Sequence, residues 1–230
     1  MLESMKGPNW RIEIDETNGV PVTRSFIISC VESYEMASRQ IRWMARILPA
    51  HWEMMFLDDG SDPPISVPSE RPANFRLIRT GEVRVVGEWT HALAMNNGIA
   101  EARGEYIVKD DVDHVFTQRA IEIANEFRGD AMLFRRSAGY LSEDLEMRLL
   151  TWEEFPHHVY STVDDIWICR RQLFLDIGGY PPFYHRLYGQ FGSVLHPYTL
   201  ADSQMPPPDA RIYWVPEQFA KYHHINAYGR

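Results

Sequence analysis

The segment Tyr106–His114 has the sequence YIVKDDVDH, a hydrophobic run that leads directly into a cluster of acids. A run of this kind is typical of a buried β-strand, and alternate side chains at its end share a direction. Asp111 and Asp113 would then converge on one cation. Because these ligand atoms are oxygens, Mg²⁺ or Mn²⁺ is favoured over Zn²⁺. The same residues also suit a solvated turn or a helix cap, so the motif alone leaves both interpretations open.

The residues before this segment alternate between strand patterns and helix patterns. Short apolar runs predict strands at 25–31, 52–57, 75–78 and 105–109. Apolar residues at helical spacing predict helices at 34–48, where Pro49 ends the helix, and at 89–102. Strands that alternate with helices form a mostly parallel sheet flanked by helices. The first half of the chain therefore predicts an α/β, Rossmann-like fold.

The second half of the chain continues this pattern less regularly. We expect helices at 117–127 and 170–177 and strands at 131–135, 166–169 and 211–215. The segment 143–158 receives no assignment. Residues 1–22 are mostly polar and are interpreted as an N-terminal extension, which leaves 23–230 as a single domain.

Composition narrows the classes of function. The chain has 230 residues, 45% of them hydrophobic, which suffices for one large core. Its formal net charge of −9 disfavours nucleic acid and anionic membranes as partners. The two cysteines, Cys30 and Cys169, lack the spacing of a zinc or redox motif and are expected in the core. Because no segment resembles a signal peptide or a membrane span, we expect a soluble, cytoplasmic protein.

Polar residues follow three of the predicted strands at the point where each strand ends. They are Ser29–Glu32, Asp58–Ser61 and Asp111–Asp113. In a parallel α/β sheet the carboxyl ends of the strands form one edge, and ligands bind beyond that edge. The sequence therefore predicts one ligand site formed by three strand ends.

Together these motifs resemble the family 2 glycosyltransferases of GT-A fold, which pair an Asp-Asp-Gly-Ser turn with a later Asp-x-Asp metal motif. Here those motifs are Asp58–Ser61 and Asp111–Asp113. Between them, 94–108 is similar to the family segment Arg-Asn-x-Gly-Ile-x-x-Ala-x-Gly-Glu-Tyr-Ile, with Met95 in place of the arginine. Residues 169–180 look like the family segment that borders the acceptor site. The resemblance covers roughly residues 25 to 190. It implies a nucleotide-binding half at about 23–115 and an acceptor-side half at about 116–230.

The resemblance also implies residues that bind a nucleoside-diphosphate sugar. Asp58 or Asp59 would bind the nucleobase or ribose, and the helix that carries Asn96 and Gly98 would pass beside the diphosphate. Turn capping and packing are the alternative interpretations for these residues. The full set of expected donor-binding residues is Ser29, Glu32, Asp58, Asp59, Asn96, Gly98 and Asp111.

A divalent ion, Mn²⁺ or Mg²⁺, is the cofactor that the resemblance implies. It would stabilise the leaving diphosphate while bound by Asp113 with help from Asp111. Either His223 or His224 would add a ligand, since adjacent histidines usually point apart. Surface exposure is the alternative for both histidines.

The general base cannot be carried over from the family. Its usual Gly-x-Glu-Asp motif is absent, because 188–193 has the sequence YGQFGS without a carboxylate. Asp164, Asp165, His185 and Asp202 are the candidate substitutes. A retaining mechanism needs no such base, so the stereochemical outcome stays open.

These observations predict a metal-dependent glycosyltransferase that moves a sugar to a hydroxyl acceptor. One alternative is a catalytically silent module that binds a sugar nucleotide or a carbohydrate. A second is a nucleotidyltransferase, although the usual glycine-rich, basic phosphate loop is missing near the first strand. The sequence indicates neither the donor sugar nor the acceptor, and it disfavours a nucleic-acid acceptor without ruling one out.

Overall fold

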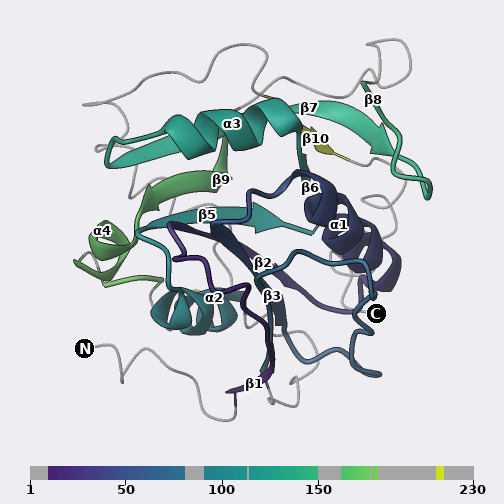
Figure 1. Cartoon of the computed structure of the whole chain (residues 1–230), viewed down its shortest axis with the longest axis horizontal. Coiled ribbons are helices and arrows are strands. Elements are labelled where there is room, and N and C mark those ends of the chain that lie inside the picture. Colours follow the sequence, from purple (N-terminus) through teal and green to yellow (C-terminus); the bar gives the residue numbers. More distant parts are fainter. Residues whose placement is uncertain are drawn as a thin grey trace.

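The computed structural model describes residues 10–80, 91–112, 114–149, 162–176, 178–180 and 211–214. Within these residues a ten-stranded sheet is flanked by helices (Figure 1). The strands are β1 Trp10–Asp15, β2 Arg24–Cys30, β3 Trp52–Asp58, β4 Phe75–Thr80, β5 Tyr106–Asp111, β6 His114–Phe116, β7 Ala131–Leu141, β8 Met147–Leu149, β9 Thr162–Arg170 and β10 Arg211–Trp214. The helices are α1 Tyr34–Ile47, α2 His91–Glu101, α3 Gln118–Glu126 and α4 Arg171–Asp176.

The strand order is β1-β4-β3-β2-β5-β9-β7-β10-β6, and β8 pairs with β7 outside this path. The four central strands β4, β3, β2 and β5 are all parallel to their neighbours in this group. Antiparallel pairing begins beyond them, where β9 joins both β5 and β7. The predicted α/β fold with a parallel core is confirmed.

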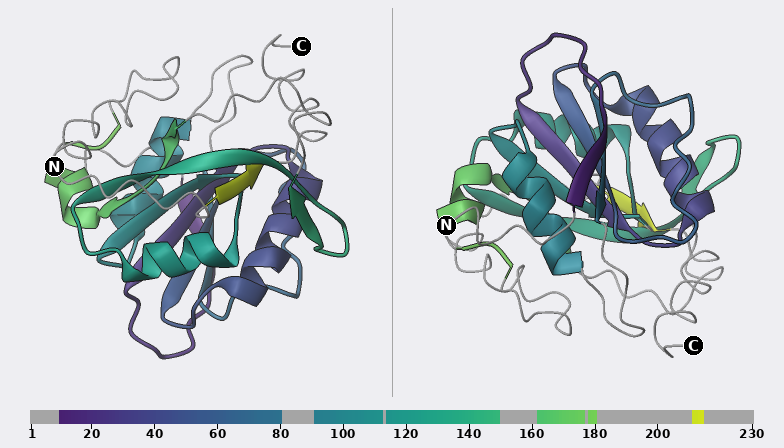
Figure 2. Two further views of the ribbon diagram at one scale, coloured as in Figure 1. Left: turned by 90° about the horizontal axis from the view of Figure 1, so that it is seen from above. Right: turned by 90° about the horizontal axis from the view of Figure 1, so that it is seen from below.

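Helices cover both faces of the sheet, as the two views of Figure 2 show. On one face, α1 and α3 pack against a hydrophobic cluster that includes Phe26 and Phe56. On the other face, α2 and α4 pack against a cluster that includes Ile27 and Leu57. Neighbouring residues of β2 and β3 thus enter opposite layers, because successive side chains of a strand point to opposite faces.

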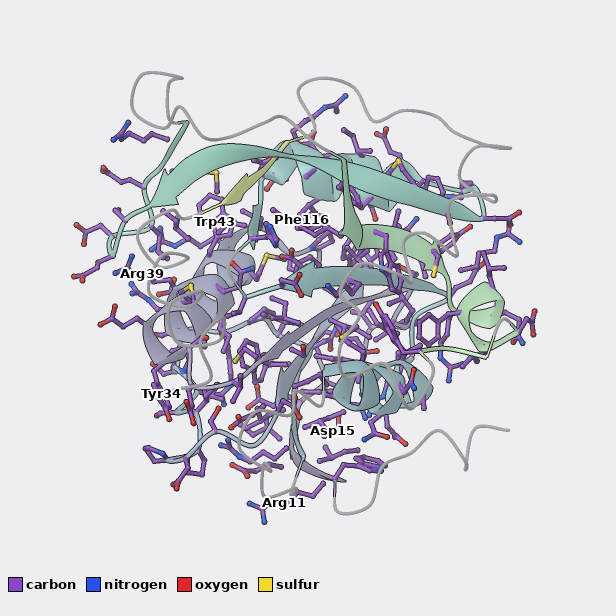
Figure 3. The ribbon with its side chains drawn as sticks, turned by 180° about the vertical axis from the view of Figure 1, so that it is seen from behind. Arg11, Asp15, Tyr34, Arg39, Trp43 and Phe116 are labelled. Carbon is purple, nitrogen blue, oxygen red and sulfur yellow. The ribbon has the colours of Figure 1, made fainter. Side chains whose placement is uncertain are left out.

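Buried aromatic and sulfur-containing side chains fill these layers. Cys30 and Cys169 are buried free thiols, as expected for small core residues. Trp52 and Trp167 are also buried. Trp43 is partly buried on α1 and donates its Nε1–H to the carbonyl of Phe116 at 2.7 Å, which ties α1 to β6 (Figure 3).

The structure contains three features that the sequence patterns did not predict. Within the segment interpreted as an N-terminal extension, β1 pairs antiparallel with β4. The strand expected at 131–135 continues to Leu141 as β7. Finally, β8 forms within the unassigned segment and pairs with the end of β7. All three involve strands at or beyond the margin of the parallel core.

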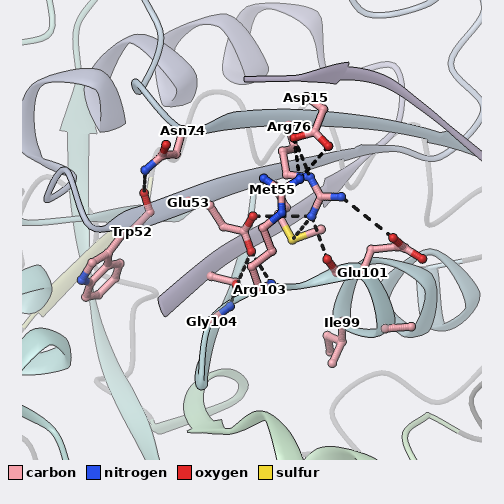
Figure 4. A network of polar contacts seen from close by, with 12 residues as sticks. Asp15, Trp52, Glu53, Met55, Asn74, Arg76, Ile99, Glu101, Arg103 and Gly104 are labelled. Carbon is pink, nitrogen blue, oxygen red and sulfur yellow. Dashed lines mark hydrogen bonds and ion pairs between the residues drawn. The ribbon is translucent and has the colours of Figure 1, made fainter. Parts of the chain in front are cut away.

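A buried ionic network joins the amino ends of the central strands (Figure 4). The carboxylate of Glu53, which is fully buried in β3, accepts hydrogen bonds from the hydroxyl of Ser25 at 2.5 Å and the backbone N–H of Arg103 at 2.6 Å. Arg76 of β4 lies with Nη1 3.5 Å from Glu53 and donates to the carbonyl of Glu101 at 2.7 Å. Asp15 of β1 completes the network by contacting both arginines.

Candidate functional site

The register of the parallel strands brings the predicted polar residues to one edge. In β2, Ser29 lies opposite Leu57 of β3 and opposite Asp111 of β5. The next residue, Cys30, lies opposite Asp58. The three strand ends therefore meet at the carboxyl edge of the sheet, as the sequence predicted.

Asp58 organises the turn that follows β3. One carboxylate oxygen accepts the backbone N–H of Ser61 at 3.1 Å, and the other accepts that of Ile65 at 3.0 Å. The second oxygen also forms an ion pair with Arg79. Gly60 has a positive φ of 78°, a conformation that glycine adopts without strain. These contacts match the turn-capping interpretation of Asp58, and nucleobase binding stays a prediction.

Backbone hydrogen bonds connect the residues that follow β2 to the turn that follows β3. Glu32 is exposed at the edge and donates its backbone N–H to the hydroxyl of Ser61 at 2.9 Å. Asp59 is buried, and its backbone N–H binds the carbonyl of Cys30 at 2.8 Å. The two loops are thereby fixed to each other, while the side chain of Glu32 faces solvent and is accessible to a ligand.

Asp111 forms an ion pair that was not predicted from the sequence. The ammonium group of Lys109 lies 2.7 Å from Asp111 Oδ1, and both side chains are almost fully buried. Nδ1 of His114 lies 3.9 Å from the other oxygen of Asp111. The signal for the ion pair is present in the sequence, since residues two apart on a strand point to the same face.

Asp110 lies between Lys109 and Asp111 in β5, so its side chain points to the opposite face of the sheet. Its carboxylate accepts a hydrogen bond from Gln40 of α1 at 3.1 Å, and the same amide contacts the carbonyl of His114. Gln40 therefore connects α1 to the acid cluster. No local sequence pattern predicts this contact, because the two residues are 70 positions apart.

The predicted metal ligands are only partly within the described residues. Asp111 is described, whereas Asp113, His223 and His224 lie outside this part of the chain. Among the described residues, no group of three or more His, Cys, Asp or Glu side chains could hold a metal ion. Asp111 offers the hard oxygen donors that Mn²⁺ and Mg²⁺ prefer, although one of its oxygens already binds an ammonium group. The described residues therefore fit an assisting role for Asp111 at most.

Helix α2 packs tightly between the sheet and the segment after α4. A Cβ atom on Gly98 would lie 2.7 Å from Leu57 Cδ1, so a larger residue at this position would displace the end of the Leu57 side chain. Asn96 donates to the carbonyl of Tyr180 at 2.7 Å and accepts its N–H at 2.9 Å. Both residues have a packing role here, and their predicted proximity to a diphosphate stays a prediction.

The base candidates are scattered along the second half of the chain. Asp164 and Asp165 lie in β9, whose residues 167–170 pair with residues 106–109 of β5. His185 and Asp202 lie outside the described residues. The four candidates thus remain predictions.

A groove of about 490 Å³ lies beside α1. At its rim Tyr34 donates its hydroxyl to the carbonyl of Pro63 at 2.8 Å, and burial together with the nearby charges of Glu32 and Asp58 raises the pKa of this hydroxyl. Figure 3 shows Tyr34 and Arg39 on the same helix. The groove is lined by Tyr34, Glu35, Ser38, Arg39, Arg42, Ser66, Pro68 and Glu143.

Solved structures share this arrangement of strands and helices. S. aureus TarS 1-349 in complex with UDP aligns with a TM-score of 0.57 at 15% identity, over 90% of this chain and 65% of that one. The mannosyltransferase PcManGT from Pyrobaculum calidifontis, in complex with GDP-Man and Mn²⁺, aligns with a TM-score of 0.53 at 13% identity, over 92% of this chain and 61% of that one. The chain has the GT-A fold.

A third GT-A structure, TarS 1-349 in complex with UDP-GlcNAc, aligns with a TM-score of 0.52 at 14% identity, over 84% of this chain and 56% of that one. The chain thus spans less than two thirds of the length of these structures. It matches no protein-family model and no curated protein. Among the described residues of this GT-A fold, none of the helices has the length and apolar character needed to span a membrane.

Proposed function

We propose that this protein transfers a sugar from a nucleoside-diphosphate sugar to a hydroxyl acceptor. The observation that supports this function is the convergence of three polar strand ends at the carboxyl edge of a GT-A fold. Ser29, Asp58 and Asp111 are brought to this edge by adjacent registers of β2, β3 and β5. Solved proteins of the same fold hold UDP, UDP-GlcNAc or GDP-Man.

The chemistry requires stabilisation of the charge that grows on the diphosphate as the glycosyl bond breaks. A divalent ion, Mn²⁺ or Mg²⁺, supplies that stabilisation when it is bound, with Asp113 as the main proposed ligand and Asp111 as the assisting one. One of His223 and His224 is the proposed third protein ligand. The turn of Asp58–Ser61 and the exposed Glu32 are proposed to hold the nucleoside.

The acceptor hydroxyl must lose its proton during transfer. We propose Asp164, Asp165 and His185 as the candidate bases, of which the first two belong to β9. An inverting enzyme would need one of them, whereas a retaining enzyme would pass the proton to the leaving phosphate.

Calorimetric titration tests donor binding directly. UDP-GlcNAc, GDP-mannose and other nucleoside-diphosphate sugars are titrated into the protein with Mn²⁺, with Mg²⁺ and with EDTA. We expect one nucleotide class to bind and to bind more tightly with metal. The variant Asp113→Ala should lose the metal enhancement, and Arg119→Met, which changes an exposed ion pair on α3, is the matched control. Failure of every donor to bind would contradict the proposal.

A silent binding module is the second candidate function. The observation that favours it is the sequence YGQFGS at 188–193, which lacks the carboxylate expected for a base. Hydrolysis and transfer assays with the bound donor and a panel of sugar acceptors separate the two functions. Tight binding without turnover would support the silent module.

A further inference from the structure

Lys109 is a buried cation in the middle of the sheet. It lies in β5, opposite Ile27 of β2 on one side and Trp167 of β9 on the other, and only 1% of the residue is exposed. The chain has three lysines, and Lys109 is the one within the described residues. A lysine at such a position is costly because an ammonium ion loses its hydration there, so its charge needs a partner.

The partner is the first acid of the Asp111–Asp113 motif. Lys109 Nζ lies 2.7 Å from Asp111 Oδ1, which is the distance of a charge-assisted hydrogen bond. The two residues are on one strand and two positions apart, so the ion pair connects no separate parts of the fold. The direct effect of this ion pair is therefore on the position and charge of Asp111, which the ammonium group of Lys109 contacts at one carboxylate oxygen.

The ion pair changes the electrostatics of the carboxyl edge. The sequence places several acids there, which would repel an anionic diphosphate. In the structure Asp111 is paired with Lys109, and Asp58 is paired with Arg79. Two of the carboxylates at this edge are therefore neutralised by cations of the protein itself.

We propose that Lys109 is a positioning residue of the nucleotide-sugar site, which fixes Asp111 and cancels its charge so that the diphosphate binds partly without a divalent ion. This inference rests on the proposed function. Removing Lys109 would expose the negative charge of Asp111 to the diphosphate, and an added divalent ion would compensate for that charge. Nucleotide binding should therefore become more dependent on metal.

The experiment compares affinities with and without metal. UDP-GlcNAc and GDP-mannose are titrated into wild type and Lys109→Met, in EDTA and in saturating Mn²⁺, and the ratio of Kd in EDTA to Kd in Mn²⁺ is determined for the donor that binds. We expect the ratio to rise about tenfold in Lys109→Met, since like charges brought together weaken binding strongly. A purely structural role for Lys109 would weaken binding equally in both conditions and leave the ratio unchanged, which would overturn the inference.

Two further variants separate charge from shape. Lys109→Met with Asp111→Asn removes both charges together and should bring the ratio below that of Lys109→Met, because the uncompensated negative charge is gone and a proposed assisting ligand of the metal is weakened. A ratio as high as that of Lys109→Met would overturn the inference. Lys109→Gln keeps a hydrogen-bond donor without the charge, and it serves if Lys109→Met does not fold. It should raise the ratio as Lys109→Met does; an unchanged ratio in this variant would also overturn the inference.

The outcomes also distinguish the two proposals. If wild type binds no donor in either condition, both the proposed function and the inference fail. If wild type binds a donor and the ratio does not respond to the variants at Lys109, the function stands and the inference alone fails. Arg119→Met, an exposed change of charge on α3, should leave the ratio unchanged.

Discussion

The two ends of the central sheet both contain buried charges, but the charges are connected differently. At the amino edge, Glu53 and Arg76 join residues from β1 to the segment after α2. At the carboxyl edge, Lys109 and Asp111 belong to one strand. Burial of a charge therefore does not by itself indicate function. A network that joins many segments stabilises the fold, whereas a local ion pair sets the charge and direction of one side chain.

The largest loss of stability should follow from a substitution in the ionic network at the amino edge. Glu53→Ala leaves Arg76 buried without this carboxylate, and Ser25 and Arg103 lose their acceptor. We expect a loss of about 3–5 kcal/mol in the free energy of unfolding, measured with urea. Glu122→Ala, in an exposed ion pair on α3, is the control and should change little. Equal stability of the two variants would contradict the structural role of the network.

Asp58 lies at the carboxyl edge, but its substitution should destabilise the fold, as substitution of Glu53 should. Asp58→Ala removes the acceptor for the backbone N–H groups of Ser61 and Ile65 and the partner of Arg79. We expect a loss of about 2–4 kcal/mol, seen as a lower Tm. Ser61→Ala is the matched change, which removes a single hydrogen bond to Glu32 and should cost about 1 kcal/mol. If Asp58→Ala lost donor binding at unchanged Tm, nucleoside binding would be the main role of Asp58.

Asn96 provides a smaller test near the same edge. Asn96→Ala removes both hydrogen bonds to the backbone of Tyr180. The expected cost is about 1–2 kcal/mol in the free energy of unfolding, measured by chemical denaturation. Donor affinity, measured by calorimetry in the same variant, distinguishes packing from diphosphate binding. Stability at the wild-type level together with weaker donor binding would favour the diphosphate role.

The smallest effect on stability should come from acidification, which protonates Glu13 of β1 and Glu16 just after it. Hydrogen bonds from Arg79 lower the pKa of Glu13 below its ordinary value of 4.5, and those from Arg71 lower the pKa of Glu16 in the same way. Their contribution to stability is present above pH 4.5 and disappears as the pH falls through the lower pKa values of the folded state. Because both groups are largely solvated, the contribution is below about 1 kcal/mol.

The pH dependence of this contribution is tested by measuring the unfolding of wild type and of Glu13→Gln from pH 7 to pH 3. The variant should be slightly less stable than wild type at pH 7, and the difference should shrink on acidification. A difference that grows toward low pH would contradict the assigned direction of the pKa shift.

Local patterns predicted the part of the fold in which strands and helices alternate along the chain. The helix at 34–48 and the strand at 52–57 match α1 and β3 closely. The helix has apolar residues at helical spacing, and the strand is a short apolar run that is buried throughout. Strand β1 alternates Trp10, Ile12 and Ile14 with charged residues, but its pairing with β4 depends on residues about 65 positions away. No short-range pattern contains that pairing.

The candidate site, too, was predictable only where it depends on local sequence patterns. Convergence of the strand ends follows from parallel pairing, so the sequence predicted the edge where Asp58 and Asp111 lie. The ion pair of Lys109 and Asp111 was also predictable in principle from the two-residue period of a strand. The contact of Asn96 with Tyr180 spans 84 positions and required the tertiary structure.

Arg79 connects the edge strand β1 to the end of β3. Its guanidinium group binds Glu13 of β1 with one side and Asp58 of the β3 turn with another. A protein shortened to begin at residue 23 would lose Glu13 and leave Arg79 anchored from one side only. We therefore expect a protein that begins at Trp10 to unfold at a higher temperature than one that begins at residue 23.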